Sequence, residues 1–142
     1  MTRPYLGNPK YTIEVLQKYG FVFAEKVWSK FFRSILMFWK KFIRASEITK
    51  DDFVLEIGPG IGTMTQYLAD SARAVTAVEI DDALIPILQD TLKDWDNVNI
   101  IHGDILKTDI QKIADEKNSG KGNQGSCKSA LLYYNTDHYG TV

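Results

Sequence analysis

The sequence has very few of the side chains that bind metals or form covalent crosslinks. Its 142 residues include one cysteine, Cys127, and two histidines, His102 and His138. One cysteine excludes an internal disulfide and cannot by itself build a thiolate metal site, and two distant histidines do not predict a metal centre. The sequence also lacks the run of about 18 apolar residues that a membrane span requires, and its first residues lack an apolar signal core. We therefore expect a cytoplasmic protein with no metal.

The composition is that of an ordinary globular protein, with 44% apolar and 25% charged residues. The charge is unevenly distributed: residues 1–50 hold ten Lys/Arg and three Asp/Glu, whereas residues 51–142 hold seven and fifteen. We therefore divide the chain into a basic N-terminal arm, 1–50, and a body, 51–142. Because phosphate contacts come from Lys and Arg, the arm suggests a polyanionic partner. A solvated basic helix remains the simpler alternative.

Residues 26–44 have the pattern of an amphipathic helix. The basic residues recur mostly at helical spacing, which places them on one face: Lys26, Lys30, Arg33, Lys40, Lys41 and Arg44. The opposite face is aromatic: Trp28, Phe31, Phe32, Phe38, Trp39 and Phe42. Such a helix could lie on RNA or on a membrane surface. For RNA, the candidate contacts are Lys26, Lys30 and Arg33.

From residue 51 onward, apolar strand patterns alternate with helical patterns. Strands are predicted at 53–57, 74–80 and 98–101, and helices at 63–72, 82–93 and 108–117, after a short helix at 12–19. Short apolar strands separated by helices of about ten residues predict right-handed crossovers and a parallel sheet. The predicted fold class is therefore α/β, a Rossmann-like, doubly wound parallel sheet truncated after its fourth strand. The composition of residues 118–126 predicts a flexible loop.

A glycine-rich run, Glu56-Ile57-Gly58-Pro59-Gly60-Ile61-Gly62, joins the first strand to the next helix. Glycines at this junction let the backbone turn sharply and let a ligand approach it closely. The dinucleotide-binding form of the loop needs glycine at its sixth position, where Thr63 stands here. The G-x-G-x-G spacing is the methyltransferase form, which accommodates the amino-acid part of S-adenosylmethionine. A purely structural turn is the alternative interpretation.

Two carboxylates follow the next two strands. Glu79 ends the second strand, and Asp104 follows the third in Gly103-Asp104-Ile105-Leu106. An acid about 20 residues beyond the glycine loop can accept hydrogen bonds from both ribose hydroxyls, and Asp104 could accept from the adenine amino group. Surface solvation or helix capping is the alternative role of each. Ligands of open parallel sheets bind at the carboxyl ends of strands, so the predicted cofactor-binding residues are Glu56, Gly58, Gly60, Gly62, Glu79 and Asp104.

Five motifs resemble those of the bacterial dimethyladenosine transferases: Leu6-Gly7-Asn8-Pro9-Lys10, Tyr19-Gly20-Phe21-Val22-Phe23, the Glu-Ile-Gly-Pro-Gly-x-Gly loop, Val78-Glu79-Ile80-Asp81 and Gly103-Asp104-Ile105-Leu106. The resemblance covers residues 5–26 and 43–118. It implies that Gly58, Glu79 and Asp104 contact S-adenosylmethionine. It also implies N6-methylation of adenines in small-subunit ribosomal RNA, with the target base presented in an unstacked loop.

Two motifs of that family are missing. Val27-Trp28-Ser29-Lys30-Phe31-Phe32 stands where the family has F-G-Q-N-F-L, and Ala130-Leu131-Leu132-Tyr133-Tyr134 stands in place of N-L-P-Y. The family's Asn and Pro carbonyl accept hydrogen bonds from the target amine, so we predict no catalytic residue in this chain. Our hypothesis for both losses is a shifted reading frame: codons that fit residues 27–34 and 127–142, read one nucleotide later, encode F-G-Q-N-F-L-D and A-N-L-P-Y-Y. A diverged relative with a real aromatic helix is the alternative.

Three functions remain open at this stage. The first is S-adenosylmethionine-dependent methylation of ribosomal RNA adenine, with the ribosomal small subunit as partner. The second is a non-catalytic module in which the basic arm contacts RNA or an anionic membrane. The third is a nicotinamide-dependent enzyme, against which Thr63 in the sixth position of the loop argues.

Overall fold

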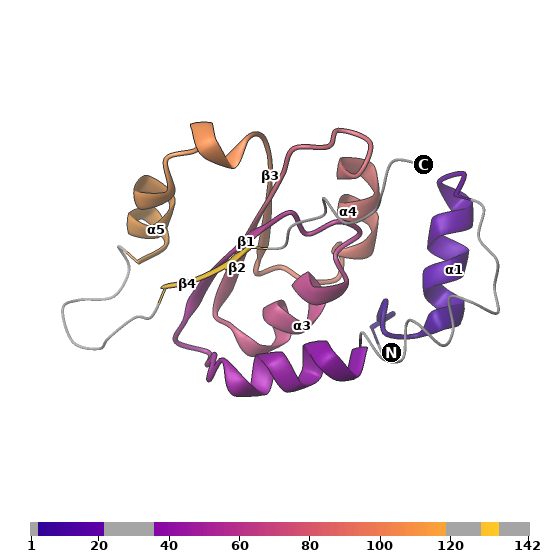
Figure 1. The fold of residues 1–142 in the computed structure, drawn as a ribbon, viewed down its shortest axis with the longest axis horizontal. Coiled ribbons are helices and arrows are strands. Elements are labelled where there is room, and N and C mark those ends of the chain that lie inside the picture. The colour runs from indigo at the N-terminus through magenta and orange to yellow at the C-terminus, as the bar shows by residue number, and fades with distance from the viewer. Residues whose placement is uncertain (1–2, 22–35, 119–128, 134–142) are drawn as a thin grey trace.

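The computed structural model describes residues 3–21 and 36–118, and the backbone of residues 129–133 (Figure 1). The elements occur in this order: α1 (Pro9–Lys18), β1 (Phe53–Ile57), α3 (Thr63–Ser71), β2 (Ala74–Glu79), α4 (Ile85–Thr91), β3 (Val98–His102), a 3₁₀ turn (Ile105–Lys107), α5 (Ile110–Asn118) and β4 (Ser129–Tyr133). Residues 36–45 are also helical.

The four described strands form one parallel sheet in the order β3-β2-β1-β4. The chain passes outward from β1 through β2 to β3, and then returns to place β4 on the other side of β1. This reversal of strand order is the switch point of a doubly wound α/β fold, beside which ligands bind. The predicted fold class is confirmed, and the switch point lies next to the glycine loop that follows β1.

Helices cover both faces of the sheet (Figure 1). Alternate residues of a strand point to opposite faces, so Val54 and Val75 pack with α3 on one face, and Phe53 and Leu55 pack on the other. Ile113 and Ala114 of α5 cover that second face. Apart from Glu56, Thr76 and Glu79, the buried residues of β1 and β2 are apolar on both faces, as expected for parallel strands between two helical layers.

Three predicted helices begin at other residues than expected, among them the helix predicted at 108–117, which is α5 and starts at Ile110. The first starts at Pro9 instead of residue 12, because the Asn8 side chain accepts a hydrogen bond from the backbone of Lys10 and the ring of Pro9 suits the first helical position. The helix predicted at 82–93 is α4, which starts at Ile85 with a proline in its first turn. Pro86 has no N–H to continue a ladder back toward residue 82, so residues 82–84 form a turn.

The segment before β1 packs onto the body of the fold. Leu6 and Val15 are buried together with Ile87 of α4, which places α1 beside α4 (Figure 1). Lys18 at the end of α1 forms an ion pair with Asp90 of α4 at 2.7 Å. Residues 3–21 of the basic arm are therefore attached to the surface of the fold, and Ile61 of the glycine loop packs against the same cluster.

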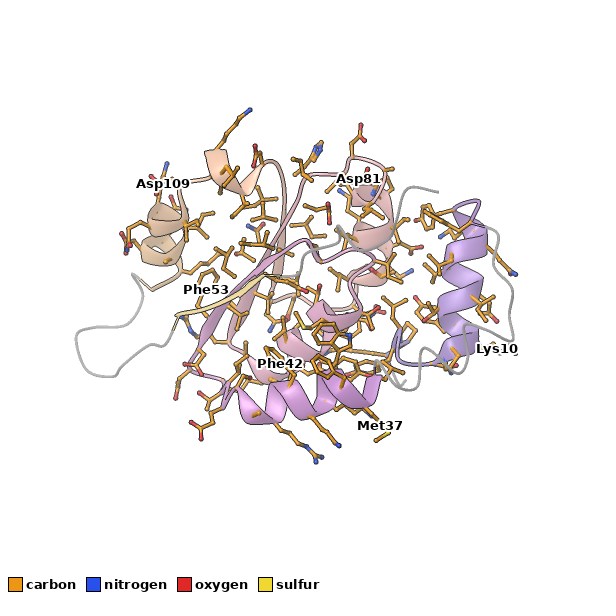
Figure 2. The ribbon with its side chains drawn as sticks, viewed as in Figure 1. Lys10, Met37, Phe42, Phe53, Asp81 and Asp109 are labelled. Atoms are coloured by element: carbon orange, nitrogen blue, oxygen red, sulfur yellow. The ribbon has the colours of Figure 1, made fainter. Side chains whose placement is uncertain are left out.

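The helical residues 36–45 turn their aromatic side inward. Trp39 and Phe42 pack against the core cluster around Val54, and Figure 2 shows Phe42 on the sheet side of this helix and Met37 on its outer side. Where the structure describes this helix, the side expected to lie on a membrane is thus partly occupied by the core, although Phe38 is exposed. The predicted RNA contacts Lys26, Lys30 and Arg33 lie outside the described residues. No helix of the described part is long and apolar enough to cross a bilayer.

Candidate functional site

The three segments singled out in the sequence meet at one edge of the sheet. The N–H of Gly58 donates to the carbonyl of Val78 at 3.0 Å, joining the glycine loop to the end of β2. The N–H of Gly103 donates to the carbonyl of Glu79 at 2.9 Å, joining the end of β3 to the same strand. The glycine loop, Glu79 and the segment around Asp104 are therefore neighbours along the carboxyl ends of adjacent strands.

Glu79 is tied directly to the glycine loop. Its Oε2 accepts a hydrogen bond from the N–H of Gly60 at 3.3 Å, and its Oε1 accepts from the N–H of Asp81 at 2.9 Å. The residue is only 4% exposed, so its carboxylate is held in place by backbone donors on both sides. The spacing of the sequence predicted that Glu79 and the loop share an edge, but it did not predict this bond between them.

Glu56 carries a buried carboxyl group with spare hydrogen-bonding capacity. The residue is 1% exposed, and among the described residues its Oε2 has no hydrogen-bond partner. Burial raises the pKa of Glu56 to about 7; the nearby charge of Glu79 adds to the rise and Thr65 opposes it. A buried oxygen without a donor is costly unless a ligand or a proton satisfies it.

Asp104 caps the turn that follows β3. Its Oδ1 accepts from the N–H of Leu106 at 2.9 Å, so the capping role considered from the sequence is present. A carboxylate has two oxygens and about four acceptor sites, so capping leaves room for a contact to a ligand. Its position is set by β3, because His102, two residues earlier, pairs with Glu79.

Comparison with known sequences shows which protein family this chain belongs to. The sequence model of the ribosomal RNA adenine dimethylase family matches residues 26–138, most of the chain. The chain belongs to this family. The ribosomal RNA small subunit methyltransferase A of Lachnoclostridium phytofermentans is 62% identical over 118 residues, which are 82% of this chain and 40% of that protein. The protein of the same name from Bacillus pumilus is 40% identical over 137 residues, 96% of this chain and 44% of that protein.

This member of the adenine dimethylase family thus spans about two fifths of the length of the curated relatives that it matches. Among solved structures, a dimethyladenosine transferase from Plasmodium falciparum matches with a TM-score of 0.47 and 33% identity, over 50% of this chain and 26% of that one.

The loop glycines have two different surroundings. Gly60 and Gly62 both have positive φ, of 61° and 90°, which only glycine adopts readily. A Cβ added to Gly60 would meet no atom within 4 Å, whereas one added to Gly62 would lie 3.1 Å from Thr91 Oγ1 and 3.2 Å from a methyl of Leu88. Gly60 therefore faces open space where a ligand could approach, and Gly62 serves the packing of the loop on α4.

We predict that adding a methyl group at Gly60 and at Gly62 lowers the unfolding free energy by different amounts. Gly60→Ala should lose about 1 kcal/mol of unfolding free energy through backbone strain alone, and Gly62→Ala about 2–3 kcal/mol, because crowding against α4 adds to the strain. Urea denaturation of both variants measures the difference. Equal losses would show that α4 yields to the extra methyl and that Gly62 has no special packing role.

One further residue at this edge was not singled out in the sequence. Ile80 follows Glu79 directly and is 68% exposed, an unusual setting for a large apolar residue at the tip of a buried strand. An exposed apolar side chain next to the Glu79 carboxylate is suited to cover the flat face of a base. The sequence contained a sign of this residue's position, because Ile80 is an apolar residue that follows the charged Glu79 at the end of the strand.

Metal ligands do not gather at this edge. Within the described ranges, no group of three or more His, Cys, Asp or Glu side chains is arranged to hold a metal ion. The carboxylates at the edge are instead bonded to backbone N–H groups, as described above for Glu79 and Asp104.

Proposed function

We propose that this chain binds S-adenosylmethionine at the edge formed by the glycine loop, Glu79 and Asp104. The observation that carries the proposal is the bond between the Glu79 carboxylate and the Gly60 N–H, which holds the loop and an acceptor side by side. The residues suit such a ligand: Gly60 faces open space, and Glu56 has a buried oxygen without a donor. An ammonium group and ribose hydroxyls are the donors that these acceptors require.

Each residue has a distinct part in this proposal. Glu79 accepts hydrogen bonds from the ribose hydroxyls, Asp104 accepts from the adenine amino group, and Ile80 lies against the adenine ring. Glu56, Gly58, Gly60 and Gly62 shape the pocket for the amino-acid part. When bound, S-adenosylmethionine supplies an electrophilic methyl group; the residues of this chain hold and orient the donor.

For the whole protein, of which this chain spans about two fifths of a relative's length, the proposed activity is N6-methylation of adenines in small-subunit ribosomal RNA. The family description and the names of the relatives support it. The chain lacks the Asn and Pro that accept from the target amine in the family's N-L-P-Y motif, and Ala130-Leu131-Leu132-Tyr133-Tyr134 stands there. Lys26, Lys30 and Arg33 remain the proposed RNA contacts.

Calorimetric titration separates this function from a nicotinamide-dependent one. The expected result is one-to-one binding of S-adenosylhomocysteine, the product form of the cofactor, and no binding of NAD. Binding of NAD but not of S-adenosylhomocysteine would overturn the assignment.

Methyl transfer to unmodified small-subunit RNA distinguishes binding from turnover. The expected result is no transfer by the chain as it stands, because an adenine amine is a poor nucleophile without its two acceptors. Transfer above background would show that the missing motif is not required, and the proposal of a chain that binds without turning over would be wrong.

A further inference from the structure

The N-terminal segment and the glycine loop are attached to the same pair of buried side chains. Gln66 of α3 accepts a hydrogen bond from the N–H of Leu6 at 2.8 Å through Oε1, and its Nε2 donates to the carbonyl of Thr91 at 2.8 Å. The hydroxyl of Thr91 then donates to the carbonyl of Ile61 at 2.9 Å. Ile61 lies between Gly60 and Gly62, so this series of three hydrogen bonds links Leu6 to the loop.

Burial gives these bonds their importance. Gln66 is fully buried and Thr91 is 2% exposed, so water cannot replace a lost partner at either position. The Thr91 hydroxyl also lies 3.4 Å from the carbonyl of Leu88 in its own helix, and the bond to Ile61 is the shorter of the two. Since a hydroxyl has one hydrogen to donate, the loop carbonyl is its better acceptor.

Thr91 also limits the position of the glycine loop sterically. Its Oγ1 is the nearest atom to a Cβ built on Gly62, at 3.1 Å. Thr91 therefore contacts the loop through the carbonyl of one residue and the backbone of the next. Across the loop, the Gly60 N–H is fixed by Glu79 and the Gly62 N–H by the carbonyl of Pro59 at 3.0 Å.

We propose that Gln66 and Thr91 are positioning residues for the cofactor. They hold the glycine loop on the side away from the ligand, and they make the geometry of the loop depend on the packing of the N-terminal segment. This inference rests on the proposed function, because it assumes that the loop binds S-adenosylmethionine. Neither residue faces the ligand in this account. Their effect passes through the Ile61 carbonyl, whose bond to Thr91 sets the orientation of the peptide that joins Ile61 to Gly62.

Thr91→Val tests the inference, because valine keeps the branched shape of threonine and puts a methyl group, which cannot donate a hydrogen bond, in place of the hydroxyl. Two readouts are needed: the dissociation constant for S-adenosylhomocysteine by calorimetry, and the hydrogen-exchange rates of the Gly60 and Gly62 amides in the chain without ligand. We expect the dissociation constant to rise roughly three- to tenfold and exchange of both amides to accelerate by a similar factor, the effect of one lost buried hydrogen bond. Thr91→Ser retains the hydroxyl and should restore both values.

Thr76→Val is the matched control. Thr76 is fully buried in β2, and its Oγ1 has no hydrogen-bond partner among the described residues, so valine there removes no bond. Affinity and loop exchange should stay at the wild-type values. Gln66→Leu leaves both Leu6 and Thr91 without their partner, so it should weaken binding and accelerate loop exchange more than Thr91→Val does. If Gln66→Leu does not fold, the Thr91 variants still test the inference.

The outcomes distinguish this inference from the function on which it rests. If the wild-type chain binds S-adenosylhomocysteine and Thr91→Val changes only stability, with affinity and loop exchange unaltered, the positioning role is wrong and the proposed function stands. If the wild-type chain does not bind S-adenosylhomocysteine at all, the proposed function is wrong and the inference fails with it.

Discussion

Replacing Glu79 by glutamine is expected to weaken the binding of S-adenosylhomocysteine roughly ten- to a hundredfold. The carboxylate uses one oxygen for Gly60 and the other for Asp81. An amide has a single acceptor oxygen, so one of these two N–H groups would face an NH₂ donor instead. In the proposed binding mode, the substitution also removes the charge that would strengthen hydrogen bonds from the ribose hydroxyls. Calorimetric titration measures the loss.

Glu14→Gln is the control for this substitution. Glu14 lies exposed on α1 and is not among the predicted cofactor-binding residues, and its replacement makes the same change of charge and shape. It should leave the affinity within twofold of the wild-type value, on the order of the small effects usual at exposed sites. A Glu79→Gln chain that binds as tightly as the Glu14→Gln chain would exclude Glu79 from the cofactor site.

Replacing Glu56 by glutamine is expected to stabilise the chain at about pH 8 and to have little effect near pH 4.5. Burial raises the pKa of Glu56 from its ordinary 4.5 to about 7, so the folded chain holds this proton more tightly than the unfolded chain does. The stabilising contribution of that proton is complete below pH 4.5 and is lost as the pH rises to about 7. A shift of this size corresponds to roughly 3 kcal/mol, and glutamine, which does not titrate, avoids the loss.

Urea denaturation of the wild-type and Glu56→Gln chains at about pH 5, 6 and 8 provides the measurement. The difference in unfolding free energy should grow with pH in favour of the variant and level off above about pH 7. Glu14→Gln, again an exposed position, should follow the wild-type curve. A difference that stays constant across this range would show that Glu56 ionises normally in the folded chain.

The strands were the part of the fold most accessible from the sequence. Residues 53–57 were predicted as a strand and form β1, because a short apolar run followed by glycine leaves few alternatives. The end of α1 was predicted to within one residue, but its start was missed, although Asn8 and Pro9 carry the usual signals of a helix N-terminus. Local capping and proline effects therefore account for the errors at the starts of α1 and α4.

The aromatic helix shows what a pattern cannot decide. Amphipathic spacing is the same whether the apolar side lies on a membrane or on a protein core, since both are apolar surroundings. Only the folded chain shows that Trp39 and Phe42 pack against the core around Val54.

For the candidate site too, the sequence predicted one part and not the other. Strand ends placed the loop, Glu79 and Asp104 along one edge, and this followed from the order of elements in the sequence. The contacts that fix them did not follow, because they join residues far apart in the chain: Glu79 to Gly60, and Gln66 to both Leu6 and Thr91. Such bonds depend on how the helices pack, and the packing of helices cannot be derived from the pattern of a single sequence.

Amide chemical shifts recorded during a titration with S-adenosylhomocysteine test the central claim most directly. A single ligand that spans three strand ends should shift the amides of Gly60, Ile80 and Asp104 together, with one common dissociation constant. The amides of α5, on the face covered by Ile113 and Ala114, should remain unchanged. Shifts confined to one of the three segments, or centred on α5, would contradict a common cofactor site at this edge.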